Sequence, residues 1–146
     1  MRVLNSVVIV ISLLVCSSVT SQTLSEKQKE REKNKVDIYS PEEKDNIQMW
    51  FYEETKKMGL TEDVRDEYSS RVSDNVFDMR RLNDKDSENS QEEIIAKFKK
   101  LVEKTNASVK TLLTEEQYEM HIKNFGKLTE AAIKKHETKS YYSRGF

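Results

Sequence analysis

The stretch LLTEEQYEMH, residues 112–121, contains a complete helix-start signal behind an apolar pair. Thr114 is the expected N-cap, because its hydroxyl can accept a hydrogen bond from the backbone N–H of Gln117. The Gln117 side chain can reach back to the N–H of Thr114, which would complete a capping box. Leu113 and Tyr118 have the spacing of a hydrophobic staple. The stretch therefore predicts a corner at which one helix ends and the next begins.

An earlier stretch, GLTEDVRDEY at residues 59–68, has the same pattern in a weaker form. Leu60 and Thr61 retain the cap, and two acidic residues follow, where the helix dipole favours negative charge. Val64 stands where the other stretch has its glutamine, so the reciprocal half of the capping box is missing. The two Leu-Thr pairs are 53 residues apart (113 − 60). This spacing indicates two related pairs of helices.

Apolar residues recur at helical spacing on both sides of each Leu-Thr pair. Two further helix starts, at Ser40 and Ser90, have a glutamate three residues later and predict capping boxes. Because amphipathic stripes must cover one another, we expect an all-α fold of four amphipathic helices, arranged as two helical hairpins in an elongated bundle or cradle. The stripes are Ile47, Trp50, Phe51 and Met58; Val64, Tyr68, Val72, Val76 and Met79; Ile94, Ile95, Phe98, Leu101, Val102, Val109 and Leu112; and Tyr118, Ile122, Phe125, Thr129, Ala132, Ile133 and His136.

Residues 1–21 have the pattern of a secretory signal peptide, with one cation, an apolar run and small residues before Gln22. A membrane anchor is the alternative, but the apolar run is well short of the roughly 20 residues that span a bilayer. A lipoprotein signal is a second alternative, although Val15 is large for the position before Cys16. We expect an exported protein, periplasmic in a Gram-negative host. Residues 22–39 form a polar leader, flexible or a frayed helix; residues 40–138 form the helical domain and 139–146 a tail.

Composition and charge limit the function classes. Without the signal peptide the chain has 24 Lys and Arg against 26 Asp and Glu, which gives no basic excess for nucleic acid. It also has no cysteine, so packing alone must stabilise the fold. His121 and His136, expected to be an exposed and a stripe-edge side chain, lie roughly 22 Å apart along one helix. We therefore predict no enzyme activity, no metal site and no cofactor.

Three local patterns have simple explanations. The polar run NDKDSENS, residues 83–90, lacks the central glycine and closing glutamate of a calcium loop and is predicted to be a solvated turn. Asn106 begins a glycosylation signal, but it lies inside a predicted helix. A further set of apolar residues lies off the main stripes and would contact either an unfolded client or a second copy of the chain: Met49, Tyr52, Phe77, Leu82 and Met120.

A Leu-Thr-x-x-Gln motif in a small, exported, charged helical chain resembles the Spy/CpxP family of bacterial periplasmic proteins. The family carries the motif twice; here residues 113–117 match fully, and Val64 departs from it. The signal ending in Ser-Gln and the LTEEQY phrase are also similar to uncharacterised small secreted proteins of Bacteroidota. The resemblance implies a homodimer forming a curved helical cradle. It further implies an ATP-independent chaperone, or a regulator that binds an envelope sensor kinase. The alternative is a structural or protein-interaction module without chaperone activity.

Overall fold

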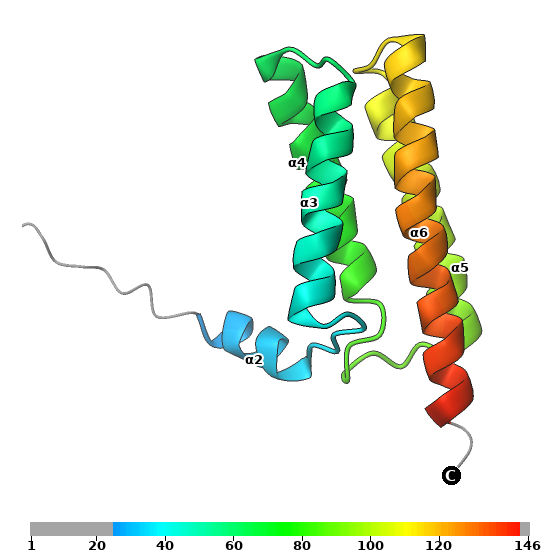
Figure 1. Ribbon diagram of the computed structural model, residues 1–146. Coiled ribbons are helices and arrows are strands. Elements are labelled where there is room, and N and C mark those ends of the chain that lie inside the picture. The colour runs from blue at the N-terminus through cyan, green and yellow to red at the C-terminus, as the bar shows by residue number, and fades with distance from the viewer. Residues whose placement is uncertain (1–24, 144–146) are drawn as a thin grey trace, which may run out of the picture. The chain divides into compact units, whose positions relative to one another are not determined.

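The computed structural model describes residues 25–143, so the predicted signal peptide lies outside the described residues. Within this part the chain forms five α-helices and no strand (Figure 1). The prediction of an all-helical fold is confirmed, but the count of four helices is wrong. The helices are α2 (Glu26–Asn34), α3 (Pro41–Lys57), α4 (Glu62–Arg80), α5 (Gln91–Lys110) and α6 (Glu115–Ser143).

The additional helix is α2, which lies inside the predicted polar leader. Its start is capped reciprocally: the Ser25 N–H donates to Gln28 Oε1 at 2.9 Å and the Gln28 N–H donates to Ser25 Oγ at 3.3 Å. None of its residues is buried. Local capping and helix-forming residues therefore define α2. The sequence leaves this leader open as flexible or a frayed helix, and the count of four includes only helices with an apolar stripe. Chain contacts divide the protein into two units, 1–33 and 34–146.

Helices α3 and α5 begin as the sequence indicates. At α3 the Ser40 N–H donates to Glu43 Oε2 at 2.7 Å and the Glu43 N–H donates to Ser40 Oγ at 3.2 Å. The same two hydrogen bonds join Ser90 and Glu93 at α5. Gly59 follows the last turn of α3 with φ +63°, a left-handed conformation that favours glycine and ends the helix.

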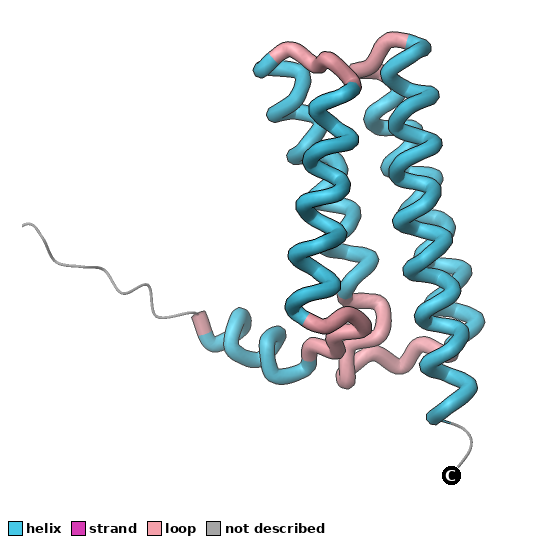
Figure 2. The backbone as a smooth tube through the Cα atoms, viewed as in Figure 1, coloured by secondary structure: helices cyan, strands magenta, loops and turns pink. Residues whose placement is uncertain are grey.

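Within residues 34–146, consecutive helices run in opposite directions, and both Leu-Thr connections lie at the same end (Figures 1 and 2). Helix α4 packs against α5, α5 against α6, and α3 against α6. The pair α3 and α4 is not among these close helix contacts in the described part of the chain. Their side chains still meet, since the rings of Phe51 and Tyr68 stack with centroids 6.4 Å apart.

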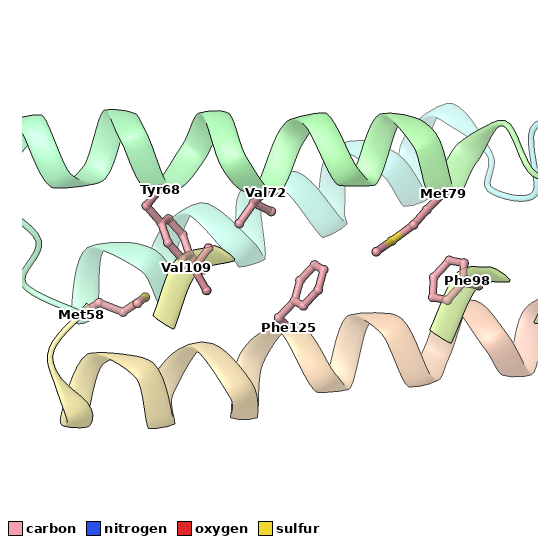
Figure 3. Close-up of a cluster of buried hydrophobic side chains, with 7 residues drawn as sticks. All are labelled: Met58, Tyr68, Val72, Met79, Phe98, Val109 and Phe125. Atoms are coloured by element: carbon pink, nitrogen blue, oxygen red, sulfur yellow. The ribbon is translucent and has the colours of Figure 1, made fainter. Parts of the chain in front are cut away.

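The apolar core draws side chains from α4, α5 and α6, and from Met58 directly after the end of α3 (Figure 3). Tyr68, Val72 and Met79 of α4 point towards α6. Burying each apolar side chain of this size stabilises the fold by about 1.5–3 kcal/mol. The core cluster is Met58, Tyr68, Val72, Met79, Phe98, Val109 and Phe125.

The α6 stripe is rotated from its predicted position at one turn. Ile122, predicted to face the core, is 39% exposed, whereas His121, predicted to be exposed, is 0% exposed. Phe125 is buried as expected, and so is His136. His121 faces the interior at this turn because its ring has hydrogen-bond partners there, Tyr68 and Asn106, which an isoleucine side chain could not use.

Candidate functional site: a groove between α3 and α4

An open cavity of about 410 Å³ lies between α3 and α4. Its walls are the facing sides of these two helices, and Phe125 and Leu128 of α6 form its floor. Apolar atoms supply most of the lining surface, although about half of the lining residues are polar. The lining residues are Ile47, Gln48, Phe51, Tyr52, Thr55, Lys56, Arg65, Ser69, Val72, Ser73, Val76, Phe125 and Leu128.

A second cavity, of about 270 Å³, lies beside the first. Ile47, Gln48, Val76, Phe125 and Leu128 line both, so the two form one continuous depression, which we call the α3–α4 groove. Ligand pockets in proteins commonly have volumes of about 300–1,000 Å³. The groove therefore has room for an extended apolar partner.

The sequence builds this groove through residue size. On α3, Ile47, Phe51 and Thr55 recur at steps of four and present one continuous face. On α4 the facing positions include Ser69 and Ser73, whose small side chains are both exposed. Closely packed interiors leave few voids between elements, because side chains fill the space. The serines leave the space between the two helices unfilled.

Charged side chains at the groove have mostly one sign. Among the described residues that line it, four are basic, namely Lys44, Lys56, Arg65 and Arg80, and Asp37 is acidic. Asp37 Oδ2 lies 2.7 Å from Lys44 Nζ, and its other oxygen lies 3.7 Å from Arg80 Nη2. The hydrogen bond from Lys44 holds the pKa of the Asp37 carboxyl below its ordinary value, and nearby positive charges add to this effect. The groove edge is therefore suited to a carboxylate.

The Leu-Thr-x-x-Gln corner lies at the α5–α6 connection. The Thr114 N–H donates to Gln117 Oε1 at 3.1 Å, and the Gln117 N–H donates to Thr114 Oγ1 at 3.3 Å. The amide nitrogen of Gln117, Nε2, donates to the carbonyl of Met58 at the end of α3, at 3.2 Å. Gln117 thus caps its own helix and links it to the other corner. Thr61 occupies the N-cap of α4 without a side-chain cap hydrogen bond.

A buried polar network lies below the two corners. Tyr68 Oη lies 2.9 Å from His121 Nδ1, and His121 Nε2 lies 3.0 Å from Asn106 Oδ1. Because an amide oxygen only accepts, Nε2 carries the proton and Nδ1 accepts from the tyrosine. The His121 ring also stacks on Phe125, with centroids 5.1 Å apart. Burial lowers the pKa of His121 to about 4 and raises that of Tyr68. The network is a fixed structural contact between α4, α5 and α6.

The sequence-predicted contact residues divide into two groups. Met49, Tyr52 and Phe77 are exposed by 64%, 54% and 51%, and Tyr52 lines the groove. Phe77 lies one helical turn beyond Ser73, which also lines it. Leu82 and Met120 pack against the core cluster instead and are partly buried. Leu60, Leu113 and Tyr118 pack there too.

Sequence reasoning missed the contribution of residues 36–39 to the groove. Val36, Asp37, Ile38 and Tyr39 line the smaller cavity, although they fall in the predicted leader. The sequence did contain a local signal, because Val36, Ile38 and Tyr39 are apolar and directly follow the mostly charged run at residues 26–35.

The described residues contain no cluster of three or more His, Cys, Asp or Glu side chains placed to hold a metal ion. In the polar loop, the buried carboxylate of Asp84 pairs with Arg81 at 2.6 Å. None of the helices in the described region has the length and apolar character needed to cross a bilayer. Comparisons with protein-family models, curated proteins and solved structures find no match to this chain.

Proposed function

We propose that this protein is an exported, non-enzymatic binding protein that holds apolar segments of partly unfolded polypeptides in the α3–α4 groove. The supporting observation is the open apolar groove itself, with the exposed rings of Tyr52 and Phe77 on or beside its walls. A contiguous exposed apolar surface, such as the lining of the groove, marks an interaction site more often than single exposed side chains do. The signal-peptide pattern supports action outside the cytoplasm.

The proposal includes an arrangement for the helices. Helices α3–α4 and α5–α6 act as two hairpins joined at their corners by Gln117, and together they form a shallow cradle with the groove along one side. A role in envelope-stress protection, as a chaperone or an accessory of a sensor, follows from the resemblance of the Leu-Thr-x-x-Gln motif. His121 fits a non-enzymatic protein, because both of its ring nitrogens are hydrogen bonded within the fold and are not free for proton transfer.

A second candidate is an interaction module in which a second copy of the chain covers the exposed apolar residues. Met49 favours it: this side chain is the most exposed of the large apolar residues in the described chain, and it is not among the groove-lining residues. Light scattering after size exclusion separates the two candidates. If the wild-type protein is a dimer and the Met49→Lys variant is a monomer, the second candidate is supported. If that variant also binds clients as well as wild type, self-association and client binding use different surfaces.

The groove itself is tested by suppression of aggregation of thermally unfolded malate dehydrogenase at near-equal molar ratio. The double variant Tyr52→Ser, Phe77→Ser should lose most of the suppression, because it removes the exposed rings beside the groove and leaves the core in place. Ile122→Ser is the matched control, since Ile122 is exposed on α6 and does not line the groove. No suppression by the wild-type protein in excess, or equal loss in the control, would overturn the proposal.

A further inference from the structure

Residues 36–39 occupy one end of the α3–α4 groove in the folded chain. The side chains of Val36, Ile38 and Tyr39 are half-buried and line the smaller cavity, together with Val76 of α4 and Phe125 of α6. The acidic side chain in this short segment, Asp37, points to the two basic groups at the cavity edge, Lys44 and Arg80. The segment therefore contacts the groove through apolar side chains and one carboxylate.

Contacts at both ends hold the 36–39 segment in place. Before it, the Lys85 N–H donates to the carbonyl of Asn34 at 2.8 Å. After it, Lys135 Nζ of α6 lies 4.4 Å from the centre of the Tyr39 ring and 2.5 Å from Glu43 of α3. These contacts come from side chains and one backbone hydrogen bond. The segment belongs to no helix or strand ladder.

The ionic contacts of the segment are of the kind that competing groups can replace. The Asp37 side chain is 42% exposed, and its partners Lys44 and Arg80 are 27% and 51% exposed, so solvent reaches both pairs. Exposed ion pairs contribute little to stability. Displacing the segment would uncover the cavity while leaving α3 to α6 packed around the core cluster.

We propose that residues 36–39 are an internal ligand of the α3–α4 groove, and that the cavity beneath them accepts from a partner polypeptide a segment of the same chemistry, apolar side chains around a carboxylate. This inference rests on the groove being the polypeptide-binding site proposed above. In the rest of the groove, Lys56, which also pairs with Glu53, and Arg65 line the larger cavity together with the apolar Phe125 and Leu128.

Fluorescence anisotropy tests the competition. The probe is a labelled synthetic peptide with the sequence Lys-Val-Asp-Ile-Tyr-Ser, copied from residues 35–40, and its twin has Asn in place of Asp. The full-length Asp37→Asn protein, whose own segment lacks the carboxylate, should bind the acidic peptide about two- to fivefold more tightly than wild type, the size expected for one exposed ion pair. The Asn peptide should gain by the same factor, because weakening the internal competitor opens the cavity to any ligand. In both proteins the acidic peptide should bind more tightly than its Asn twin, because Lys44 and Arg80 remain in place.

Asp45→Asn is the matched control, because Asp45 is exposed on α3 and does not line the groove. In the reverse direction, Lys44→Gln with Arg80→Gln should abolish the preference for the acidic peptide. Circular dichroism of each variant confirms that its helices are intact. No gain for either peptide with Asp37→Asn, an equal gain in the Asp45→Asn control, or no peptide binding to any variant would overturn the internal-ligand proposal. If the aggregation assay still succeeds, only this inference fails; if it fails as well, the groove is not the client site.

Discussion

The two Leu-Thr corners use almost the same residues to connect helices, yet they produce different results. At the α5–α6 corner, Thr114 and Gln117 form a reciprocal cap, and α5 and α6 pack closely. At the α3–α4 corner, Thr61 has no side-chain cap hydrogen bond, Val64 replaces the glutamine, and the two helices enclose a groove. The corner with the complete cap belongs to the closed helix pair, and the weaker one to the open pair.

The helix pair α3 and α4 also contacts the pair α5 and α6 through equivalent positions. Tyr68 lies eight residues after Leu60 and His121 eight residues after Leu113, and their side chains are hydrogen bonded to each other. The glutamine of the second motif donates across to the last turn of α3. The two Leu-Thr corners therefore place equivalent positions of α4 and α6 next to each other. Because the residues at these positions differ, tyrosine in one and histidine in the other, they can form a hydrogen bond.

The largest test of this comparison removes the histidine. His121→Ala deletes a fully buried ring and leaves the Tyr68 hydroxyl and the Asn106 amide oxygen without this partner. A cavity of this size and the unpaired polar groups together should lower the free energy of unfolding by about 4 kcal/mol. Urea denaturation followed by circular dichroism measures this. Tyr68→Phe, which removes a single hydroxyl, should cost only about 1–2 kcal/mol.

A result below about 1 kcal/mol for His121→Ala would contradict the buried network, because a total stability of roughly 5–15 kcal/mol is sensitive to such a loss. Such a result would mean that the packing of α4 against α6 does not depend on the contact between Tyr68 and His121.

The same histidine predicts a pH dependence of stability. Its pKa in the folded chain is lowered to about 4 from the ordinary value of 6.5. Below about pH 6.5 the unfolded chain therefore takes up a proton that the folded chain takes up only near pH 4. Stability from this site is full above pH 6.5 and falls by about 3 kcal/mol as the pH drops to about 4. Urea denaturation at several pH values measures the change.

His121→Gln is the control for this pH series, since glutamine keeps hydrogen-bonding capacity and does not titrate. The slope between pH 6.5 and 5 should flatten in the variant. The carboxyls of Asp37, Glu43 and Glu93, whose pKa values are lowered in the fold, account for losses at more acid pH. An unchanged slope would show that His121 is not the titrating group.

Sequence reasoning worked best where the structure depends on neighbours along the chain. The capping boxes at Ser40, Ser90 and Thr114 each need two side chains three residues apart, and all of them form. The Val72 and Phe125 stripes follow from spacing alone, and both residues are buried.

It failed where contacts join distant residues. His121 is buried because Tyr68, on another helix, donates to it, and no local pattern in α6 indicates this. The groove lies between α3 and the serines of α4, and its lining is completed by Phe125 and Leu128 of α6, which are distant in the sequence. Asp37 becomes part of the site only because Lys44 and Arg80 meet beside it. Tertiary placement decided each of these.

The smallest expected effect compares the two threonines directly. Thr114→Ala should lower the free energy of unfolding by about 1 kcal/mol, because it removes a hydroxyl that accepts from the Gln117 N–H. Thr61→Ala should cost only a few tenths of a kcal/mol, since the Thr61 hydroxyl makes no cap hydrogen bond in the fold. Urea denaturation of both variants under identical conditions gives the difference. Equal losses would show that the two corners are equivalent in energy, and the difference between the open and closed helix pairs would then have to arise from the residues along the helices, the serines of α4 first among them.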